Sequence, residues 1–338
     1  MNKMLQHKFE HISKLVGNTP LVEIQFRYKG EGRRIFAKME HYNLSGSIKD
    51  RIALHILKKA YEDGRLKEGD IIAEATSGNT GISFSALGAY LKNKVVIYLP
   101  DWMSKERMQI IESYGAELRL VSRDEGGFLG SIKKTEEFAR QNNVFLPCQF
   151  SNEDNAETYY LTMGLEIVNQ LKSINLEADA VVAGVGTGGT IMGLAKRLKE
   201  VNPNCFAYPL EPLSSPTLST GYKTGKHRIE GISDEFIPSI IDFSKLDDVI
   251  AVDDGDAINM SRMLAHDLGI GVGISSGANF IGALIAQEKR GKQSAVVTVF
   301  PDDNKKYLST DYSKEQEIKE HYYSKDIELI GANVLVNR

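Results

Sequence analysis

The chain has 338 residues, 42% of them hydrophobic and 25% charged, which predicts a globular protein long enough for two lobes. A net charge of −4 gives no reason to expect nucleic acid as a partner, and no apolar run has membrane-spanning length. Two cysteines outside any CxxC or Cys/His cluster argue against a metal site and a disulfide framework, and both are expected to be buried. The polar N-terminus has no signal-peptide core, so a cytoplasmic location is expected.

The first half of the chain predicts a polar arm and then alternating strands and helices. Residues 1–13 form the arm, and Pro20 lies in a turn that leads into a short extended run. The expected strands cover residues 34–39, 70–75, 94–99, 117–121 and 144–147. The expected helices cover residues 50–63, the stretch after 81 up to 91, 104–114 with Ser104 as N-cap, and 130–142. This alternation predicts a small parallel sheet with covering helices.

The second half continues the same alternation with one irregular interruption. The expected strands cover residues 178–184, 205–209, 248–252, 295–300 and 327–336. The expected helices cover residues 157–172, 190–201 and 254–268, with a further helix after residue 277. Residues 213–245 lack periodicity, and a segment of that length without regular elements is usually functional. Two α/β lobes with a cleft between them are therefore expected.

Lys49 stands in a Ser/Gly-rich turn, residues 43–51, directly before an apolar-periodic helix. A lysine amine can attack a carbonyl group when its surroundings suppress its positive charge. The alternative is a solvated lysine at the start of a helix, although the first turn of a helix prefers acidic residues.

The run Gly184-Val-Gly-Thr-Gly-Gly189 fits the pattern G-x-G-x-x-G between a strand and a helix. Glu211 follows at about the distance expected of an acid that binds a ribose, so the run is compatible with a dinucleotide. The run by itself indicates only a phosphate site, because glycines and a helix N-terminus would bind the phosphate of any ligand. A plain tight turn is the third possibility.

Two further loops precede helices. Residues 76–81, Thr-Ser-Gly-Asn-Thr-Gly, offer hydroxyl, amide and backbone donors that suit a carboxylate, or they form an ordinary capped turn. Ser275 lies in the loop 274–277, where it can bond a ligand or act as an N-cap.

Together these stretches supply an amine nucleophile, a phosphate cradle, a carboxylate cradle and a neutral hydroxyl. That set describes a site for pyridoxal 5′-phosphate and an amino acid. A dinucleotide enzyme would leave Lys49 and the loop 76–81 unexplained.

The chain resembles the cysteine synthase / cystathionine β-synthase family of fold-type II pyridoxal-phosphate enzymes. The family's motifs occur in its order: Gly17-Asn-Thr-Pro-Leu21, Gly46-Ser-Ile-Lys-Asp-Arg51, Thr76 to Gly81, Gln149-Phe150 with Asn152, Gly186 to Thr190, Gly273 to Gly277 and Tyr307-Leu-Ser-Thr310. The resemblance implies two open twisted α/β domains with the active site between them. Residues 46–155 would form the smaller domain, and residues 1–45 with 156–338 the larger one. It also implies a homodimer.

The resemblance assigns roles residue by residue. Lys49 would carry the cofactor and then move a proton at the substrate's α-carbon, Asn79 would bond the ring oxygen, and Ser275 would face the pyridine nitrogen. Substrate carboxylate binding would fall to Thr76, Ser77, Thr80 and Gln149. Phosphate binding would fall to Gly186, Thr187, Gly188, Gly189 and Thr190.

In residues 231–238 the chain differs from the sulfide-using members of the family that it resembles. Those members carry small neutral residues here, in the pattern Gly-Ile-Gly-Ala-Gly-Phe-Ile-Pro. This chain places Ser233, Asp234 and Glu235 at those positions, and cystathionine-forming members carry an acid matching Glu235. A carboxylate repels anionic hydrosulfide but serves a neutral nucleophile as a general base. We therefore expect Asp234, ahead of Glu235, to act as that base, with Glu235 near the substrate; the alternative is that both acids face solvent.

The expected reaction is β-elimination and β-replacement on L-cysteine, releasing hydrogen sulfide through an α-aminoacrylate, with water as second nucleophile to give L-serine. Alternatives within the family are an O-acetylserine sulfhydrylase and a synthase that joins a thiol or amine to form cystathionine, lanthionine or diaminopropionate. A nicotinamide-dependent dehydrogenase and a non-catalytic paralogue are the alternatives from other classes, and the intact Lys49 argues against the paralogue.

Overall fold

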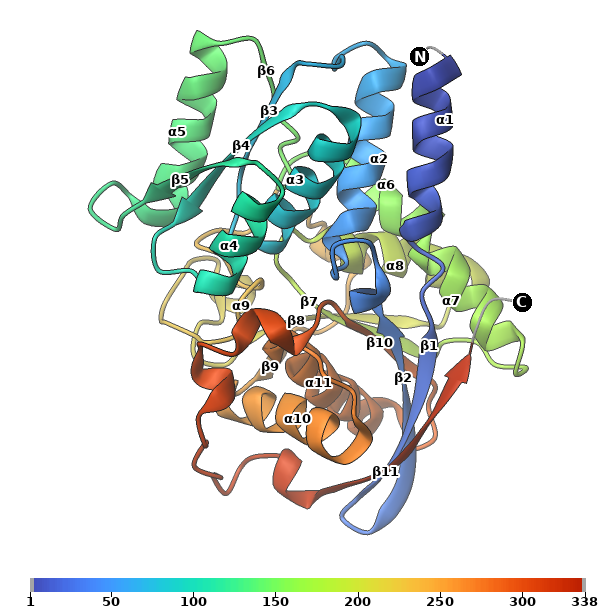
Figure 1. Ribbon diagram of the computed structural model, residues 1–338. Helices are drawn as coiled ribbons and strands as arrows, with labels where there is room; N and C mark the ends of the chain where they lie inside the picture. The colour runs from blue at the N-terminus through green and yellow to red at the C-terminus, as the bar shows by residue number, and fades with distance from the viewer. Residues whose placement is uncertain (1–2, 336–338) are drawn as a thin grey trace.

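The computed structural model describes residues 3–335 and contains two β-sheets (Figure 1). The seven-stranded sheet has the order β11-β1-β2-β10-β7-β8-β9, and the four-stranded sheet has the order β5-β4-β3-β6. The strands of the larger sheet are β11 (Ile327–Leu335), β1 (Leu21–Tyr28), β2 (Glu31–Met39), β10 (Val296–Phe300), β7 (Ala180–Gly184), β8 (Phe206–Pro212) and β9 (Ile250–Val252). Those of the smaller sheet are β5 (Glu117–Val121), β4 (Lys94–Pro100), β3 (Ile71–Ala75) and β6 (Val144–Phe145).

The smaller sheet is parallel throughout, as the βα alternation predicts. In the larger sheet β11, β1 and β2 pair antiparallel, and the remaining neighbours pair parallel. The predicted α/β fold class with two open sheets is thereby confirmed. The proposed domain limits at residues 46 and 155 stay a prediction.

Helices cover both faces of each sheet (Figure 1). On the smaller sheet, α5 (Gly127–Gln141) packs on one face, and α3 (Asn79–Leu91) with α4 (Lys105–Ser113) on the other. On the larger sheet, α10 (Asp254–Leu268) and α11 (Ile274–Arg290) lie on one face and α8 (Gly189–Val201) on the other. The remaining helices are α1 (Lys3–Ile12), α2 (Lys49–Glu62), α6 (Asp154–Leu161), α7 (Met163–Lys172) and the short α9 (Thr217–Thr220).

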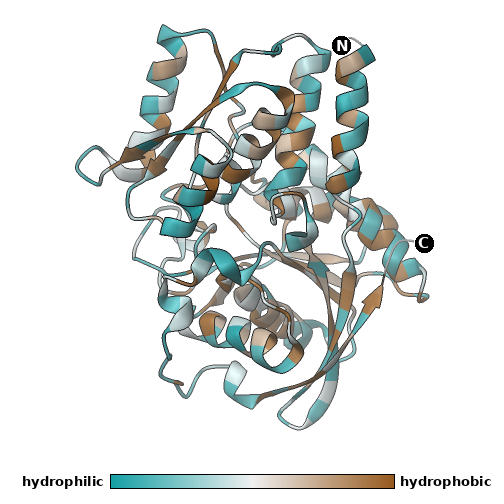
Figure 2. Ribbon diagram, viewed as in Figure 1, coloured by the Kyte–Doolittle hydropathy of each residue, from teal (hydrophilic) through white to brown (hydrophobic). Residues whose placement is uncertain are grey.

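Hydrophobic residues follow the strands and the inner faces of the helices, whereas the outer helix faces are polar (Figure 2). One core cluster joins α2 and α3 to the larger sheet through residues such as Ile56, Phe84 and Val181, all fully buried. A separate cluster fills the space between the larger sheet and the pair α10/α11. The Lys49 turn therefore lies where the two units share a core. No helix within residues 3–335 is long and apolar enough to cross a membrane.

The predicted polar arm is wrong for the part that the structure describes, because residues 3–12 form the helix α1. Leu5, Phe9 and Ile12 are spaced four and three residues apart, so they share one helix face, and all three are buried. The ring of Phe9 packs edge-on against Tyr61 at 5.7 Å between centroids. The helix was not predicted because its apolar face consists of only these three residues.

Three other expectations need correction. The helix predicted over residues 157–172 is two helices, α6 and α7, that meet at Thr162, whose φ of −114° and ψ of −82° are not helical. The helix α5 begins at Gly127, three residues before its predicted start. Cys148 is exposed, in a turn where its φ is 55°, while Cys205 is buried as expected. Residue 336 of the last predicted strand lies outside the described residues.

Candidate active site

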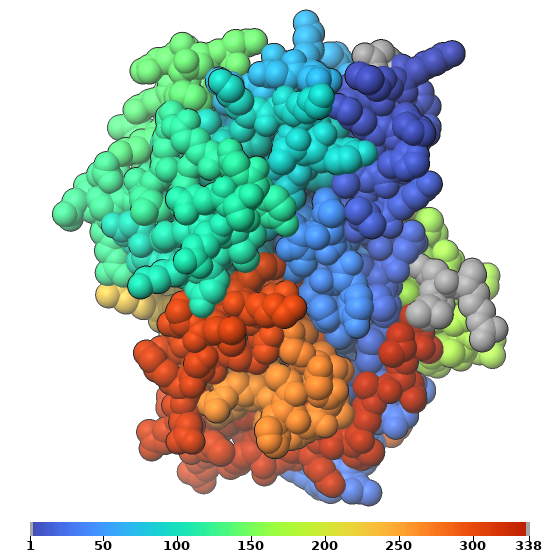
Figure 3. Space-filling view, viewed as in Figure 1, coloured from blue at the N-terminus to red at the C-terminus, as the bar shows by residue number. Residues whose placement is uncertain are grey.

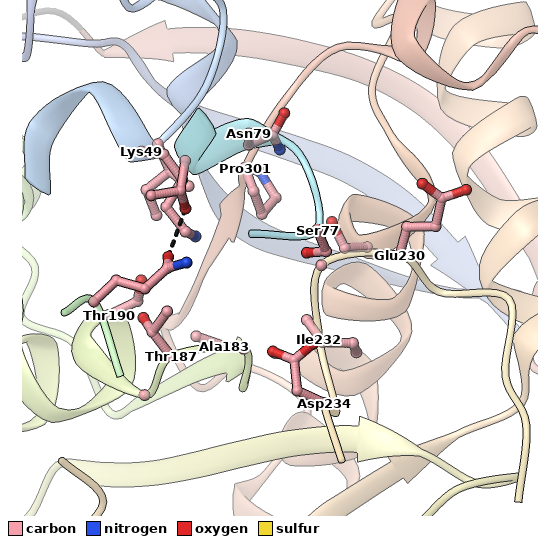
Figure 4. Close-up of a pocket in the computed structure, with 18 of the residues that line it drawn as sticks. Lys49, Ser77, Asn79, Ala183, Thr187, Thr190, Glu230, Ile232, Asp234 and Pro301 are labelled. Carbon is pink, nitrogen blue, oxygen red and sulfur yellow. Dashed lines mark hydrogen bonds between the residues drawn. The ribbon is translucent and has the colours of Figure 1, made fainter. Parts of the chain in front are cut away.

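The functional loops come together at the carboxyl ends of parallel strands. The segment 76–78 follows β3, the segment 185–188 follows β7, and Pro301 follows β10. Ligands of open α/β sheets bind in the crevice at that edge. A pocket lies there, lined by Lys49, Ser77, Asn79, Thr80, Gln149, Gly186, Thr187, Gly188, Thr190, Asp234 and Ser275 among the predicted residues (Figure 4).

Lys49 begins α2, and its side chain lines this pocket. Burial lowers the pKa of its amine, although Asp302 and Asp234 act in the opposite direction. The turn before it is held by Asp50, whose carboxylate accepts hydrogen bonds from Ser45 N and Ser45 Oγ at 2.7 and 2.5 Å. A fixed amine with suppressed charge is what a carbonyl-attacking lysine needs.

The N-terminus of α8 provides the predicted phosphate cradle. Its N-cap is Gly188, no side chain caps it, and its first turn carries no acidic residue. Thr187 and Thr190 add hydroxyl groups on the pocket side of the helix start. The partial positive charge of the helix end and these hydroxyls suit a phosphate dianion. Gly189 belongs to the cradle by sequence but is not part of the pocket lining.

The helix α3 also starts at the pocket without a side-chain cap or an acidic first turn. Thr80 Oγ1 donates to Gln149 Oε1 at 2.6 Å, which joins the two predicted carboxylate-binding stretches. Thr76 lies behind the lining, where its buried Oγ1 accepts a hydrogen bond from Gly78 N at 3.0 Å. The start of α3 itself has no side-chain cap, because its N-cap is Gly78.

Asn79 and Ser275 face the pocket from two different helices. Asn79 Nδ2 donates to Asp302 Oδ2 at 2.7 Å, and its buried Oδ1 has no partner within the described part of the chain. Ser275 lies in the first turn of α11, whose N-cap is Gly273 and has no side-chain cap, so Ser275 is not the N-cap. The Oδ1 atom of Asn79 is therefore left available for a ligand, and Ser275 lines the same pocket.

The two acids of the irregular segment differ in position. Asp234 lines the pocket, and burial raises the pKa of its carboxyl to about 6 against the opposing effect of Lys49 (Figure 4). Glu235 pairs with Lys223 at 3.0 Å and is outside the pocket lining. The geometry therefore gives no support to substrate binding by Glu235.

Sequence reasoning missed three groups at the site. Arg107 and Glu230 line the pocket and form an ion pair with each other. Asp302 is fully buried and holds Asn79, and it also accepts a hydrogen bond from Tyr307 OH at 2.7 Å. Arg107 stood in a predicted helix and Glu230 in an irregular segment, and no spacing pattern linked them.

Residues 12–302 match the family model described as "Pyridoxal-phosphate dependent enzyme". The chain belongs to this family. A cysteine synthase of Staphylococcus aureus is 40% identical over 307 residues, covering 91% of this chain and 98% of that protein. A hydrogen sulfide-producing enzyme from Fusobacterium nucleatum has a crystal structure with a TM-score of 0.96 and 62% identity, covering 98% of this chain and 100% of that one. An aspartate-to-asparagine mutant of that enzyme was solved with an α-aminoacrylate intermediate.

The residues at the pocket fit pyridoxal phosphate. The amine of Lys49 has a lowered pKa, the start of α8 is free of acidic side chains, and Asn79 has an unpartnered oxygen. The site thus belongs to a pyridoxal-phosphate enzyme of the cysteine synthase family, as the motifs predict.

Proposed function

We propose that the enzyme converts L-cysteine and water into L-serine and hydrogen sulfide. The observation that carries the proposal is the Asp234 carboxylate, which faces the pocket without an ion-pair partner within residues 3–335. The hydrogen sulfide-producing activity named for the Fusobacterium nucleatum relative supports the release of sulfide. Its aspartate-to-asparagine mutant, solved with α-aminoacrylate, supports a role for an aspartate after that point.

Each residue has a stated task in this proposal. Ser77, Thr80 and Gln149 bind the substrate carboxylate, and Lys49 Nζ takes the proton from the α-carbon. When bound, pyridoxal phosphate withdraws the electron pair left at that carbon. The bond from the β-carbon to sulfur breaks, and hydrosulfide leaves and takes up a proton. Asp234 then removes a proton from water, whose oxygen bonds to the β-carbon, and Lys49 Nζ returns a proton to the α-carbon to complete L-serine.

The electrostatics favour water over hydrosulfide as second nucleophile. A pKa of about 6 leaves Asp234 mostly ionised near neutral pH, so it can accept a proton. The same negative charge repels hydrosulfide by about 4 kcal/mol at 4 Å in a surface-like dielectric. A sulfhydrylase gains nothing from such a group, because its nucleophile is already an anion.

The test is product analysis of the purified holoenzyme with L-cysteine alone, and separately with O-acetylserine and sulfide. We expect stoichiometric serine and hydrogen sulfide in the first reaction. Asp234→Asn should form the α-aminoacrylate species at the normal rate and consume it 10²- to 10⁴-fold more slowly. Asp242→Asn is the matched control, because Asp242 lies in the same irregular segment but is exposed, and its carboxylate accepts a hydrogen bond from Ser244 N. Unchanged turnover in Asp234→Asn would rule the proposal out.

A second candidate is cysteine synthesis from O-acetylserine, favoured by the Staphylococcus aureus relative. Faster conversion of O-acetylserine and sulfide than of cysteine and water would select it. The homodimer and the cytoplasmic location expected earlier stay predictions, and light scattering tests the dimer by a molar mass twice that of the chain.

A further inference from the structure

Arg107 is buried at the pocket and lies against the loop that is expected to take the substrate carboxylate. Its side chain is 2% exposed. A Cβ atom added to Gly78 would lie 2.1 Å from Arg107 Cδ and 2.5 Å from Arg107 Nε, so the arginine packs directly on the backbone of that loop. Any shift of the loop 76–81 is therefore transmitted to Arg107 by contact.

The other end of Arg107 reaches the segment that carries Asp234. Arg107 Nη1 donates to Glu230 Oε2 and, at 3.2 Å, to Ser104 Oγ. The guanidinium also lies over the ring of Tyr307, 4.5 Å from its centroid. Within residues 3–335 this is the ion pair that joins α4 to residues 230–234, which we call the acid loop. Glu230 and Asp234 lie at its two ends (Figure 4).

In the described part of the chain, the rest of the acid loop is held by segments that follow β7 and β8, and not by α4. Ser233 N donates to Val185 O at 2.8 Å, and Ser233 Oγ donates to Ser215 O at 2.9 Å. Ile232 fills the space beside Gly184, where an added Cβ would lie 2.8 Å from its Cγ2 atom. Only four positions separate Glu230 from Asp234, so we expect a displacement at Glu230 to turn the Asp234 side chain even though Ser233 stays held.

We propose that Arg107 and Glu230 are positioning residues for the second half of the reaction, because their ion pair ties the acid loop to the carboxylate-binding loop and so keeps Asp234 turned into the pocket. This inference rests on the proposed function. Carboxylate binding and nucleophile activation are then coupled through one side chain.

Neighbouring residues of α4 provide a control, because they also hold α4 against the larger-sheet unit but do so away from the acid loop. Ser104 Oγ donates to Lys306 O at 2.9 Å, and Glu106 accepts from Ser309 N and Ser309 Oγ at 2.9 and 2.6 Å. The space-filling view shows the segment after β10 pressed against the smaller-sheet unit on this face (Figure 3). Glu106 precedes Arg107 on the same helix, but within residues 3–335 it forms no hydrogen bond or ion pair with the acid loop.

The experiment separates the two half-reactions of the holoenzyme by stopped-flow absorbance. Glu230→Ala should form α-aminoacrylate from L-cysteine within threefold of the normal rate, since neither Lys49 nor residues 76–81 belong to the acid loop, and Arg107→Met should slow this step less than the next one. Its consumption should slow by about 10- to 100-fold, the cost of misplacing a catalytic group by about 1 Å. The double variant should be no slower than the worse single variant, because both changes break one contact. Glu106→Gln should keep both rates.

Hydrogen exchange of the holoenzyme gives a readout that does not depend on turnover. Peptides covering residues 226–236 should exchange faster in Arg107→Met and Glu230→Ala and at the normal rate in Glu106→Gln. Equal slowing of both half-reactions, or unchanged exchange of those peptides, would overturn the inference.

Asp234→Asn, measured alongside, distinguishes this inference from the proposed function. Normal consumption of α-aminoacrylate in Asp234→Asn refutes both ideas. Slow consumption in Asp234→Asn together with normal consumption in Arg107→Met and Glu230→Ala refutes only the positioning role.

Discussion

Gly189→Ala tests whether the phosphate cradle and the carboxylate site share one support. Gly189 is the first residue of α8, and a Cβ atom there would lie 2.0 Å from Asn155 Oδ1 and 2.5 Å from its Cγ. Asn155 is fully buried, and its Nδ2 donates to Gln149 O at 2.8 Å and to Thr187 Oγ1 at 2.9 Å. The added methyl group must therefore displace the amide that connects both sites.

The cost follows from those two hydrogen bonds. Each is worth about 1 kcal/mol net, and leaving a buried partner unsatisfied adds about 1–3 kcal/mol. Partial relaxation reduces the sum, so we expect the free energy of unfolding to fall by about 2–4 kcal/mol. If Thr187 binds the phosphate, losing its orientation costs about 1.5–3 kcal/mol of binding, which is about 10- to 100-fold in cofactor affinity.

The assay combines denaturant unfolding with a titration of cofactor-free protein by pyridoxal phosphate, followed by absorbance near 410 nm. Gly32→Ala is the control, because a Cβ at Gly32 meets nothing within 4 Å, and it should change stability by less than about 0.5 kcal/mol. Asn155→Ala should reproduce the losses of Gly189→Ala. If Gly189→Ala kept wild-type stability and cofactor affinity, the structural link through Asn155 would be refuted.

Two further predictions concern buried charged groups, and a third concerns the attachment of the cofactor. Burial raises the pKa of Glu74 from 4.5 to about 8, so folded protein holds a proton that unfolded protein releases between those values, and stability falls as pH rises through that window. In denaturant titrations, the free energy of unfolding of Glu74→Gln should therefore exceed that of the wild type by on the order of 3 kcal/mol at pH 8–9 and should equal it near pH 4.5. A difference that stays constant with pH would contradict this. Arg51→Met leaves the buried carboxylates of Glu40 and Glu166 without their main partner and should cost about 3–5 kcal/mol in the same assay, whereas the exposed Arg65→Met should cost less than about 1 kcal/mol. Borohydride should fix a pyridoxyl group on the wild type at Lys49, as mass spectrometry of peptides shows, and a modified peptide in Lys49→Ala would contradict that attachment.

The elements that the sequence predicts well are those whose apolar residues follow a regular period over their whole length. The strands 117–121 and the helix 254–268 agree with the structure at both ends. The errors fall where the signal is weak or interrupted. Leu5, Phe9 and Ile12 make too short a stripe to stand out, and Thr162 breaks a pattern that stays apolar on both sides.

The residues of the candidate site likewise fall into those with a local sequence signal and those without one. Its loops are local, so the residues of 76–80, 186–190 and Ser275 could be found from glycine and hydroxyl patterns before helices. Asp234 was found only because the segment departs from the family's small residues. The ion pair of Arg107 with Glu230 joins residues 123 positions apart, and neither residue is unusual in its own segment. Long-range pairs of this kind depend on the packing of the two units and have no local sequence signal.

The glycine-rich run shows why one motif alone decides little. A dinucleotide enzyme would need Glu211 free to bind a ribose. Here Glu211 is fully buried, and its carboxylate accepts hydrogen bonds from Leu218 N at 2.6 Å and from Ser219 Oγ, so it holds the start of α9. What remains of the motif is an uncapped helix start in the pocket that the buried Lys49 also lines, and such a helix start suits a phosphate. The acid is used for folding, and the specificity of the site comes from the other loops that meet the same pocket.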